Sequence, residues 1–116
     1  MSRRAQRPLH PLEHHPSFRA VIEAAPPVAE LATRIANQDI VGSLVIACGD
    51  LADGFASPPD SPRRVEAHHR AWASIREIDR VVSAARHSHR APRELVRRAQ
   101  RAIDRADVLV GALLSN

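Results

Sequence analysis

The stretch from Asp39 to Phe55 constrains the fold of this chain more than any other part of the sequence. Its apolar residues recur at alternating intervals of three and four positions, which places them on one side of an α-helix. Further apolar residues widen this stripe until the first half of the helix has almost no polar side. Such a helix must be buried against more than one neighbour, and at roughly 25 Å it is too short to span a bilayer. We therefore expect a core helix inside a bundle. The residues of the stripe are Val41, Leu44, Cys48, Leu51 and Phe55.

Three other stretches have the same helical periodicity. We expect Ser17 to be the N-cap of the first helix. This helix should kink or restart at Pro26-Pro27, because proline removes a backbone donor and clashes with the preceding turn. A third helix should follow Ser61-Pro62, where an N-cap serine precedes a proline at the first helical position. Pro92 should open the last helix.

The connections between these stretches are short, which favours neighbouring helices that run in opposite directions. The sequence therefore predicts an all-α fold, an antiparallel up-down-up-down four-helix bundle over residues 17–116. Residues 1–16 are rich in Arg, Pro and His and poor in apolar residues, so we expect a disordered basic arm there.

Composition limits the cellular setting. Cys48 is the one cysteine, which argues against a disulfide scaffold and fits a reducing cytoplasm. No apolar run is long enough to cross a bilayer, and the basic N-terminus lacks the apolar run of a signal peptide. We expect a cytoplasmic protein with no membrane partner.

The charge is distributed unevenly along the chain. Its formal net charge is +4, but residues 20–60 sum to −5 and residues 61–105 to +7. All 17 basic residues are Arg, which reflects either a GC-rich genome or selection for bidentate phosphate binding. The two halves could match each other within or between subunits, or leave a basic face for an acidic partner.

Two short motifs resemble those of a known family. The segment Ala73-Ser74-Ile75-Arg76-Glu77-Ile78 resembles the "small-Ser-x-Arg-Glu-apolar" signature of bacterial four-helix-bundle proteins. Leu51-Ala52-Asp53-Gly54 is similar to the end of that family's second helix. These proteins are related to those encoded in intervening sequences of large-subunit ribosomal RNA genes.

The resemblance covers roughly residues 18–114 and implies a left-handed bundle without enzymatic activity or cofactors, typically assembled as a ring-shaped homopentamer. In a related branch, accessory proteins of diversity-generating retroelements partner a reverse transcriptase and bind nucleic acid through a basic surface. The resemblance gives a structural role to six motif residues: Leu51, Asp53, Gly54, Ser74, Arg76 and Glu77. The chain departs from the family at Val41-Gly42 and Val45-Ile46, where a basic pair and small residues are usual.

Two surfaces are candidates for interaction. The excess apolar surface of the second helix predicts a contact between subunits of a homo-oligomer, with five candidate residues: Ile40, Val41, Leu44, Val45 and Ile46. A row of arginines on the last helix predicts binding of RNA or DNA phosphates. Its candidates are Arg93, Arg97, Arg98, Arg101 and Arg105, although a solvated helix face would show the same pattern.

Other candidate sites have ordinary explanations. Glu66-x-x-His69 has the spacing of a bundle metal site, but the second such motif that a di-iron centre needs is missing, and we expect no metal. His68 should be a hydrogen-bonded core or interface residue. Arg76 should pair with Asp50 or Asp53 and fix the register of two helices, or else contact a partner.

These observations leave three functional hypotheses. The first is a non-enzymatic, oligomeric scaffold or interaction protein. The second is an accessory factor that binds nucleic acid, or partners a reverse transcriptase, through its Arg-rich surface. The third is an enzyme with a metal in the bundle, although no nucleophile elbow or phosphate loop frames a catalytic residue.

Overall fold

The computed structural model describes residues 11–115, and this part of the chain forms four α-helices preceded by one short 3₁₀-helix. The 3₁₀-helix η1 spans Pro11–His14, and α1 (Pro16–Arg34), α2 (Asp39–Ala56), α3 (Pro62–Ala85) and α4 (Arg93–Ala112) follow in order. No β-strand occurs within residues 11–115. The all-α class expected from the sequence is thereby confirmed.

The ends of α3 follow the expected local chemistry. Ser61 is the N-cap of α3, and its hydroxyl accepts a hydrogen bond from the backbone N–H of Arg64 at 3.2 Å. Pro62 occupies the first helical position, where no backbone donor is needed. At the other end, the backbone N–H groups of Arg86 and His87 donate to carbonyls of the last turn, and the chain leaves the helix.

The first helix differs from its prediction in two respects. It continues as one α-helix through Pro26 and Pro27, so the helix does not restart there, and of the two predicted alternatives only a kink remains. Ser17 is not its cap: His15 is the N-cap, and Ser17 is buried in the first turn. Packing of α1 against its neighbours outweighs the local cost of the two prolines.

The beginning of the bundle also lies earlier in the sequence than predicted. Residues 11–16, which the sequence assigned to the arm, form η1 and the start of α1. Glu13 is buried, Leu12 packs against the core, and the ring of His15 stacks on Phe55 of α2. Residues 1–10, the remainder of the predicted arm, lie outside the described part of the chain.

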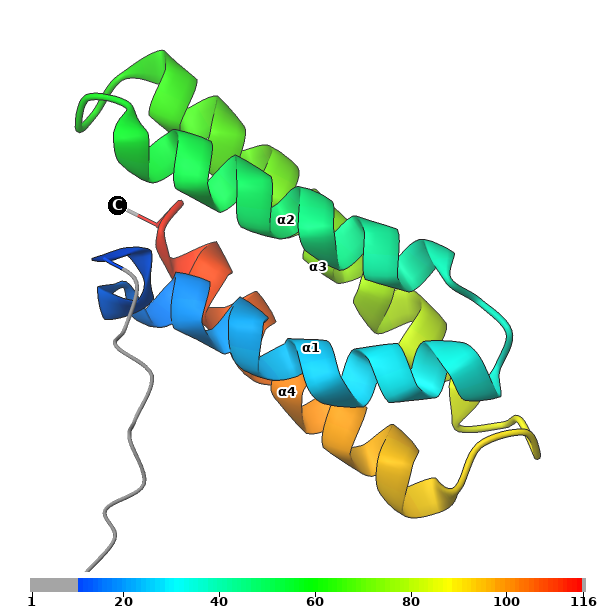
Figure 1. Cartoon of the computed structure of the whole chain (residues 1–116). Coiled ribbons are helices and arrows are strands. Elements are labelled where there is room, and N and C mark those ends of the chain that lie inside the picture. Colours follow the sequence, from blue (N-terminus) through cyan, green and yellow to red (C-terminus); the bar gives the residue numbers. More distant parts are fainter. Residues whose placement is uncertain (1–10, 116) are drawn as a thin grey trace, which may run out of the picture.

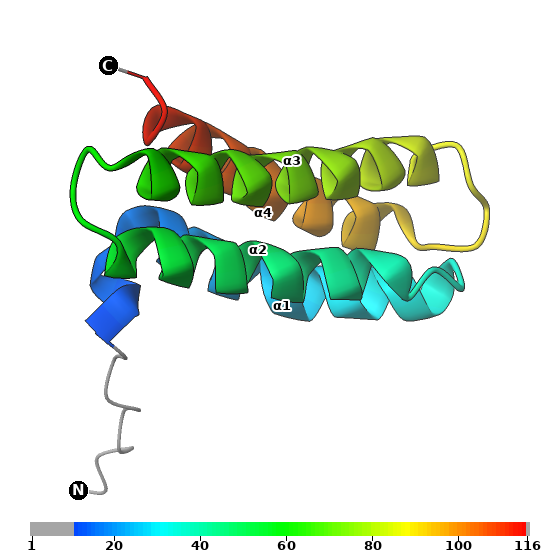
Figure 2. The same cartoon turned by 90° about the horizontal axis from the view of Figure 1, so that it is seen from above.

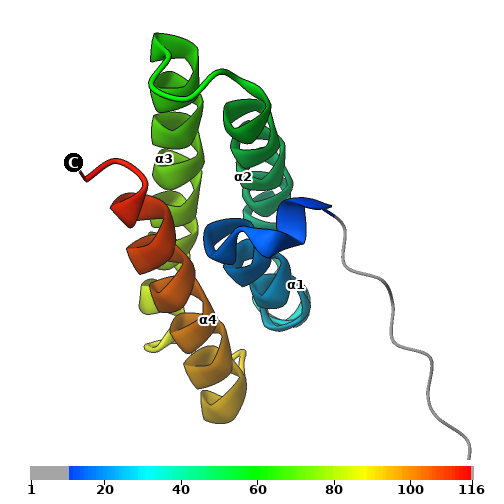
Figure 3. The same cartoon turned by 90° about the vertical axis from the view of Figure 1, so that its left-hand side faces the viewer.

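Each helix packs mainly on two others. The most extensive contacts join α2 to α3 and α1 to α4, and smaller contacts join α3 to α4 and α1 to α2. Figure 1 shows α2 along α3 and α1 along α4, and Figure 2 shows α3 and α4 on one side of the molecule with α1 and α2 on the other. Figure 3 shows the same division from another side, with α3 beside α4 and α2 beside α1.

The interior of the bundle is aliphatic. The residues at its centre have almost no solvent-accessible surface, and they come from all four helices. The largest of them are Leu31, Ile40, Leu51, Ile75, Ile78 and Ile103. Within residues 11–115, no helix combines the length and the apolar character needed to cross a membrane.

Candidate functional site

The connections between helices gather at the two ends of the bundle. The α1–α2 and α3–α4 connections lie at one end, and the α2–α3 connection lies at the other, which is also the end of η1 (Figures 1 and 2). Three of the five arginines predicted on the last helix lie near the first of these ends. They are Arg93, Arg97 and Arg101, all exposed.

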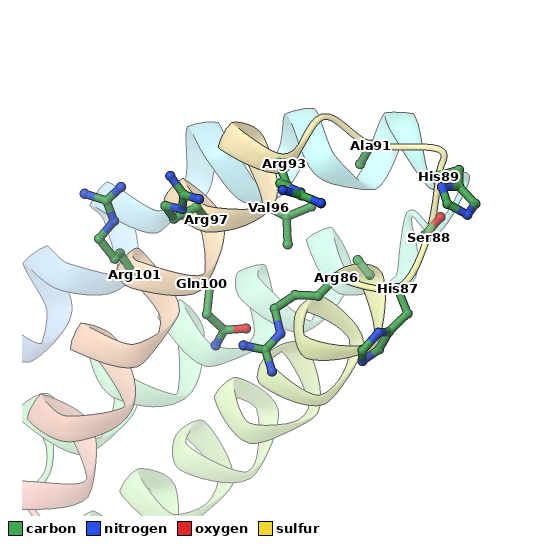
Figure 4. Close-up of a pocket in the computed structure, with 11 residues that line it drawn as sticks. Arg86, His87, Ser88, His89, Ala91, Arg93, Val96, Arg97, Gln100 and Arg101 are labelled. Carbon is green, nitrogen blue, oxygen red and sulfur yellow. The ribbon is translucent and has the colours of Figure 1, made fainter.

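These three arginines line a pocket of about 810 Å³ between the end of α3, the connection 86–92 and the first half of α4. The pocket is strongly basic, since four Arg and two His contribute to its lining. Figure 4 shows these side chains around it, with Arg86 from the end of α3 and Arg93 from the start of α4. The six basic residues are Arg86, His87, His89, Arg93, Arg97 and Arg101.

Apolar and amide groups complete the pocket. Ala85 and Val96 are buried, and Ala91 lies in the connection. The side-chain amide of Gln100 donates to Asp79 Oδ1 at 2.7 Å and to Asp104 Oδ1 at 2.8 Å. Both N–H groups of the Gln100 amide are therefore hydrogen-bonded, and the carboxylates of Asp79 and Asp104 each accept one of these bonds.

The arginines of the pocket differ in their partners. Glu94 forms ion pairs with Arg97 at 3.3 Å and with Arg101 at 3.8 Å. All three side chains are more than half exposed, and such pairs contribute under about 1 kcal/mol, so an incoming anion can compete for both arginines. Arg86 and Arg93 have no acidic partner among residues 11–115.

The first turn of α4 adds to the positive potential at this end of the bundle. Pro92 is its N-cap and makes no side-chain capping bond. The backbone N–H groups of a first helical turn carry partial positive charge. Anions are therefore favoured at the rim of the pocket as well as among its guanidinium groups.

The other two arginines of the predicted row lie elsewhere. Arg98 pairs with Glu30 of α1 at 3.4 Å. Arg105 lines a shallow depression of about 380 Å³ with Asp104, Val108 and Leu109. Only three arginines of the predicted row therefore line the pocket, namely Arg93, Arg97 and Arg101. Arg86, His87 and His89 line it as well, and they were not predicted to belong with the row.

The predicted subunit contact on α2 needs correction. Ile40 and Leu44 are buried in the core of their own chain, so they offer no surface to a second copy. Val41 is half-buried and packs against that core. Val45 and Ile46 are 66% and 57% exposed, because they lie on the side of α2 that faces away from its neighbours.

The other end of the bundle contains a buried imidazole. His68 is 3% exposed, and its Nε2 has no hydrogen-bond partner, so the expected hydrogen bond is absent. Phe55 stacks on His15 with ring centroids 3.8 Å apart and meets His68 edge-on at 4.9 Å. Burial lowers the pKa of His68, and the charges of Arg64 and His15 lower that pKa further.

Three of the motif residues, all from the end of α2, have clear structural roles. Leu51 is fully buried, and Gly54 lies against His68. Asp53 pairs with Arg63 at 3.0 Å and with Arg70 at 3.5 Å.

The expected pairing of Arg76 is wrong. Its guanidinium lies 5.0 Å from the ring centroid of Trp72, while Asp50 pairs with Arg70 at 3.4 Å. Arg70 lies nearer the start of α3 than Arg76 does, and it is Arg70 that meets the second half of α2. Glu77 pairs with Arg80 on the same helix, and Ser74 is partly buried.

The geometry required for a metal site is not present in the described chain. Glu66 and His69 are both exposed on α3. Within residues 11–115, no three or more His, Cys, Asp or Glu side chains are grouped so that they could hold a metal ion.

Comparisons of the chain with protein-family models, with curated proteins and with solved structures gave no match. A function is therefore inferred from the residues of the site and their surroundings.

Proposed function

We propose that this protein is a non-enzymatic interaction module that binds the phosphate backbone of nucleic acid through the basic pocket between α3 and α4. One observation carries the proposal: four arginines from two helices line one pocket. Two of them, Arg86 and Arg93, have no acidic partner within residues 11–115.

The chemistry of arginine favours phosphate as the ligand. A planar guanidinium donates two parallel hydrogen bonds to a phosphate group, and each phosphate neutralised by a cation releases a counterion. The pocket lining contains no Phe, Tyr or Trp. Binding should therefore depend on the backbone and not on the base sequence.

An antiparallel up-down-up-down bundle belongs to the same proposal. The packing of each helix on its neighbours in the chain, the pairing of α1 with α4, and the alternation of the connections between the two ends support it. This topology brings the end of α3 beside the start of α4, which is what assembles the pocket. It also agrees with the resemblance to intervening-sequence and retroelement accessory proteins, and with a nucleic-acid partner.

Fluorescence anisotropy with a labelled single-stranded RNA and a labelled duplex tests this function. The full chain should bind at low salt, and the logarithm of its affinity should fall linearly with the logarithm of salt concentration. Absence of binding at low salt would contradict the proposal.

We also propose that copies of the chain assemble, as the resemblance to ring-forming proteins implies. Val45 and Ile46 are exposed on α2, and Val108 is 68% exposed on α4. The pair Val45 and Ile46 and the residue Val108 lie on helices without extensive contact with each other. The α2 pair of one copy can therefore meet Val108 of the next copy. Repetition of such a contact closes into a ring where the rotation permits.

Light scattering of the purified chain tests the assembly. A mass several times that of one chain supports it, with a pentamer as the state implied by the resemblance. A stable monomer at high protein concentration would contradict it.

A further inference from the structure

The pocket between α3 and α4 is concave and about half open to solvent, whereas a surface that binds the side of a duplex is an open face. Its volume of about 810 Å³ falls in the range of small-molecule sites, roughly 300–1,000 Å³. A nucleotide fits into such a space. The backbone of a continuous duplex is the outer edge of a wide cylinder and touches only the rim of a pocket of this size.

The arginines in the pocket come from two helices. Arg86 extends from the end of α3 and Arg93 from the start of α4, and Gln100 also comes from α4 (Figure 4). Neither arginine has an acidic partner within residues 11–115. A phosphate that enters the pocket can accept hydrogen bonds from these guanidinium groups.

A phosphate at the end of a strand satisfies this arrangement better than a phosphate within it. A phosphate monoester has a charge of about −1.5 to −2 at neutral pH and three free oxygens. A phosphodiester has one charge and two free oxygens. The guanidinium groups of the pocket therefore gain more from a terminal phosphate than from an internal one.

The remaining lining suits the nucleotide that carries this phosphate. Ala91 is partly exposed and offers apolar contact to a sugar, while Val96 and Ala85 lie almost fully buried behind it. The rings in the pocket lining are the imidazoles of His87 and His89, at the mouth formed by the connection. Such a lining can accommodate any base, so recognition depends mainly on the phosphate.

We propose that this pocket holds the terminal phosphate of a single-stranded nucleic acid, so that the protein distinguishes phosphorylated from unphosphorylated strand ends. The inference rests on the proposed function, since it specifies which nucleic acid the basic pocket prefers. The shared ligand chemistry is a phosphate monoester, and a free mononucleotide carries it as well as a strand end does.

Three internally labelled single-stranded RNAs of one sequence test the inference by fluorescence anisotropy. One has a 5′-phosphate, one a 3′-phosphate and one hydroxyl groups at both ends. The full chain should bind at least one phosphorylated strand about tenfold more tightly than the unphosphorylated strand, which is the effect of one charge-assisted hydrogen bond. The double variant Arg86→Gln/Arg93→Gln should lose this preference.

A matched control removes the same charge outside the pocket. The double variant Arg98→Gln/Arg105→Gln should bind less tightly to all three strands but keep the preference. All of these arginines are exposed, so both variants should fold, and circular dichroism checks that they do.

The remaining outcomes separate the inference from the proposed function. Tight binding of all three strands with equal affinity overturns the preference for ends and leaves nucleic-acid binding intact. Failure to bind any strand at low salt overturns both. Full competition by adenosine monophosphate at concentrations equal to those of the strand would make the pocket a mononucleotide site and would also overturn the inference.

Discussion

Gly54 on α2 lies directly against the imidazole of His68 on α3, and a β-carbon at position 54 would overlap with Cδ2 and Nε2 of that ring. The contact brings the two helices together next to the connection that joins them. It gives a physical reason for a glycine at the end of the "apolar-Ala-acidic-Gly" motif, because only a residue without a side chain leaves room for the imidazole.

Gly54→Ala should lower the free energy of unfolding by about 1–3 kcal/mol, the usual cost of forcing an extra group into a packed interior. Urea unfolding followed by circular dichroism measures it. Gly42 and Gly49 are matched controls, since a β-carbon at either position meets no atom within 4 Å. Alanine there should stabilise α2 by about 0.5–1 kcal/mol, and an equal effect at all three positions would contradict this account.

The burial of His68 should make stability depend on pH. Its pKa in the folded chain is lowered by burial and by the charges of Arg64 and His15. Between the folded and unfolded pKa values, the unfolded chain binds more protons, so the free energy of unfolding rises with pH. The stability present above the ordinary histidine pKa, about 6.5, should be lost as pH falls through the lower, folded value.

Urea unfolding at a series of pH values measures this dependence. His68→Leu removes the titrating group and should flatten the dependence between neutral and mildly acidic pH, whatever its effect on stability at neutral pH. The exposed His69 is the matched control, and His69→Gln should leave the dependence unchanged. An identical pH dependence of stability for His68→Leu and the parent chain would contradict the role assigned to His68.

Another side-chain contact, between Trp72 and Asp107, joins α3 to α4. The indole N–H of Trp72 donates a hydrogen bond to Asp107 Oδ1 at 2.6 Å, and Trp72 is the one tryptophan of the chain. Asp107→Ala should lower the free energy of unfolding by about 1–2 kcal/mol, because it leaves a half-buried donor without its charged acceptor. The indole emission should change as well, whereas Glu66→Ala, on an exposed part of α3, should affect neither property.

The limits of the helices could be predicted largely from local sequence. Ser61-Pro62 gives the start of α3. The predicted stripe on α2 contains the buried Leu44 and Leu51, but its other members, Val41, Cys48 and Phe55, are only partly buried. The continuity of α1 through Pro26-Pro27 could not be predicted in this way. It depends on packing with α2 and α4, and that packing exceeds the local penalty of proline.

The candidate sites depended more strongly on the tertiary fold. Ile40 and Val45 both belong to the apolar surface of α2, but only the placement of neighbouring helices decides that the first is buried and the second exposed. Arg86 stands apart from the arginine row in the sequence and joins it only because the chain reverses over residues 86–92. The basic character of that short connection, with His87, His89 and Arg90 close together, was the available signal.

The exposed apolar pair on α2 predicts the behaviour of the assembly. Val45→Glu/Ile46→Glu places two charges on the proposed contact between copies and should shift the chain toward the monomer in native mass spectrometry. Val65→Glu is the control, because Val65 is 44% exposed and lies on α3, whereas the proposed contact involves Val45 and Ile46 of α2 and Val108 of α4. A double variant with the same subunit number as an oligomeric parent chain would show that this pair is not at the interface.

The central claim concerns the basic pocket, and the salt dependence of nucleic-acid binding tests it most directly. Affinity for a single-stranded RNA is measured over a range of salt concentrations for the parent chain and for Arg86→Ala/Arg93→Ala. Each phosphate neutralised contributes about −0.7 to the slope of log affinity against log salt for a single strand. The variant should bind more weakly, with a slope less negative by about 0.7 for the one phosphate that the pocket is proposed to hold. Residues 1–10 are the same in both chains, so the difference reports on the pocket. Equal affinities and equal slopes would contradict the assignment of this pocket as the binding site.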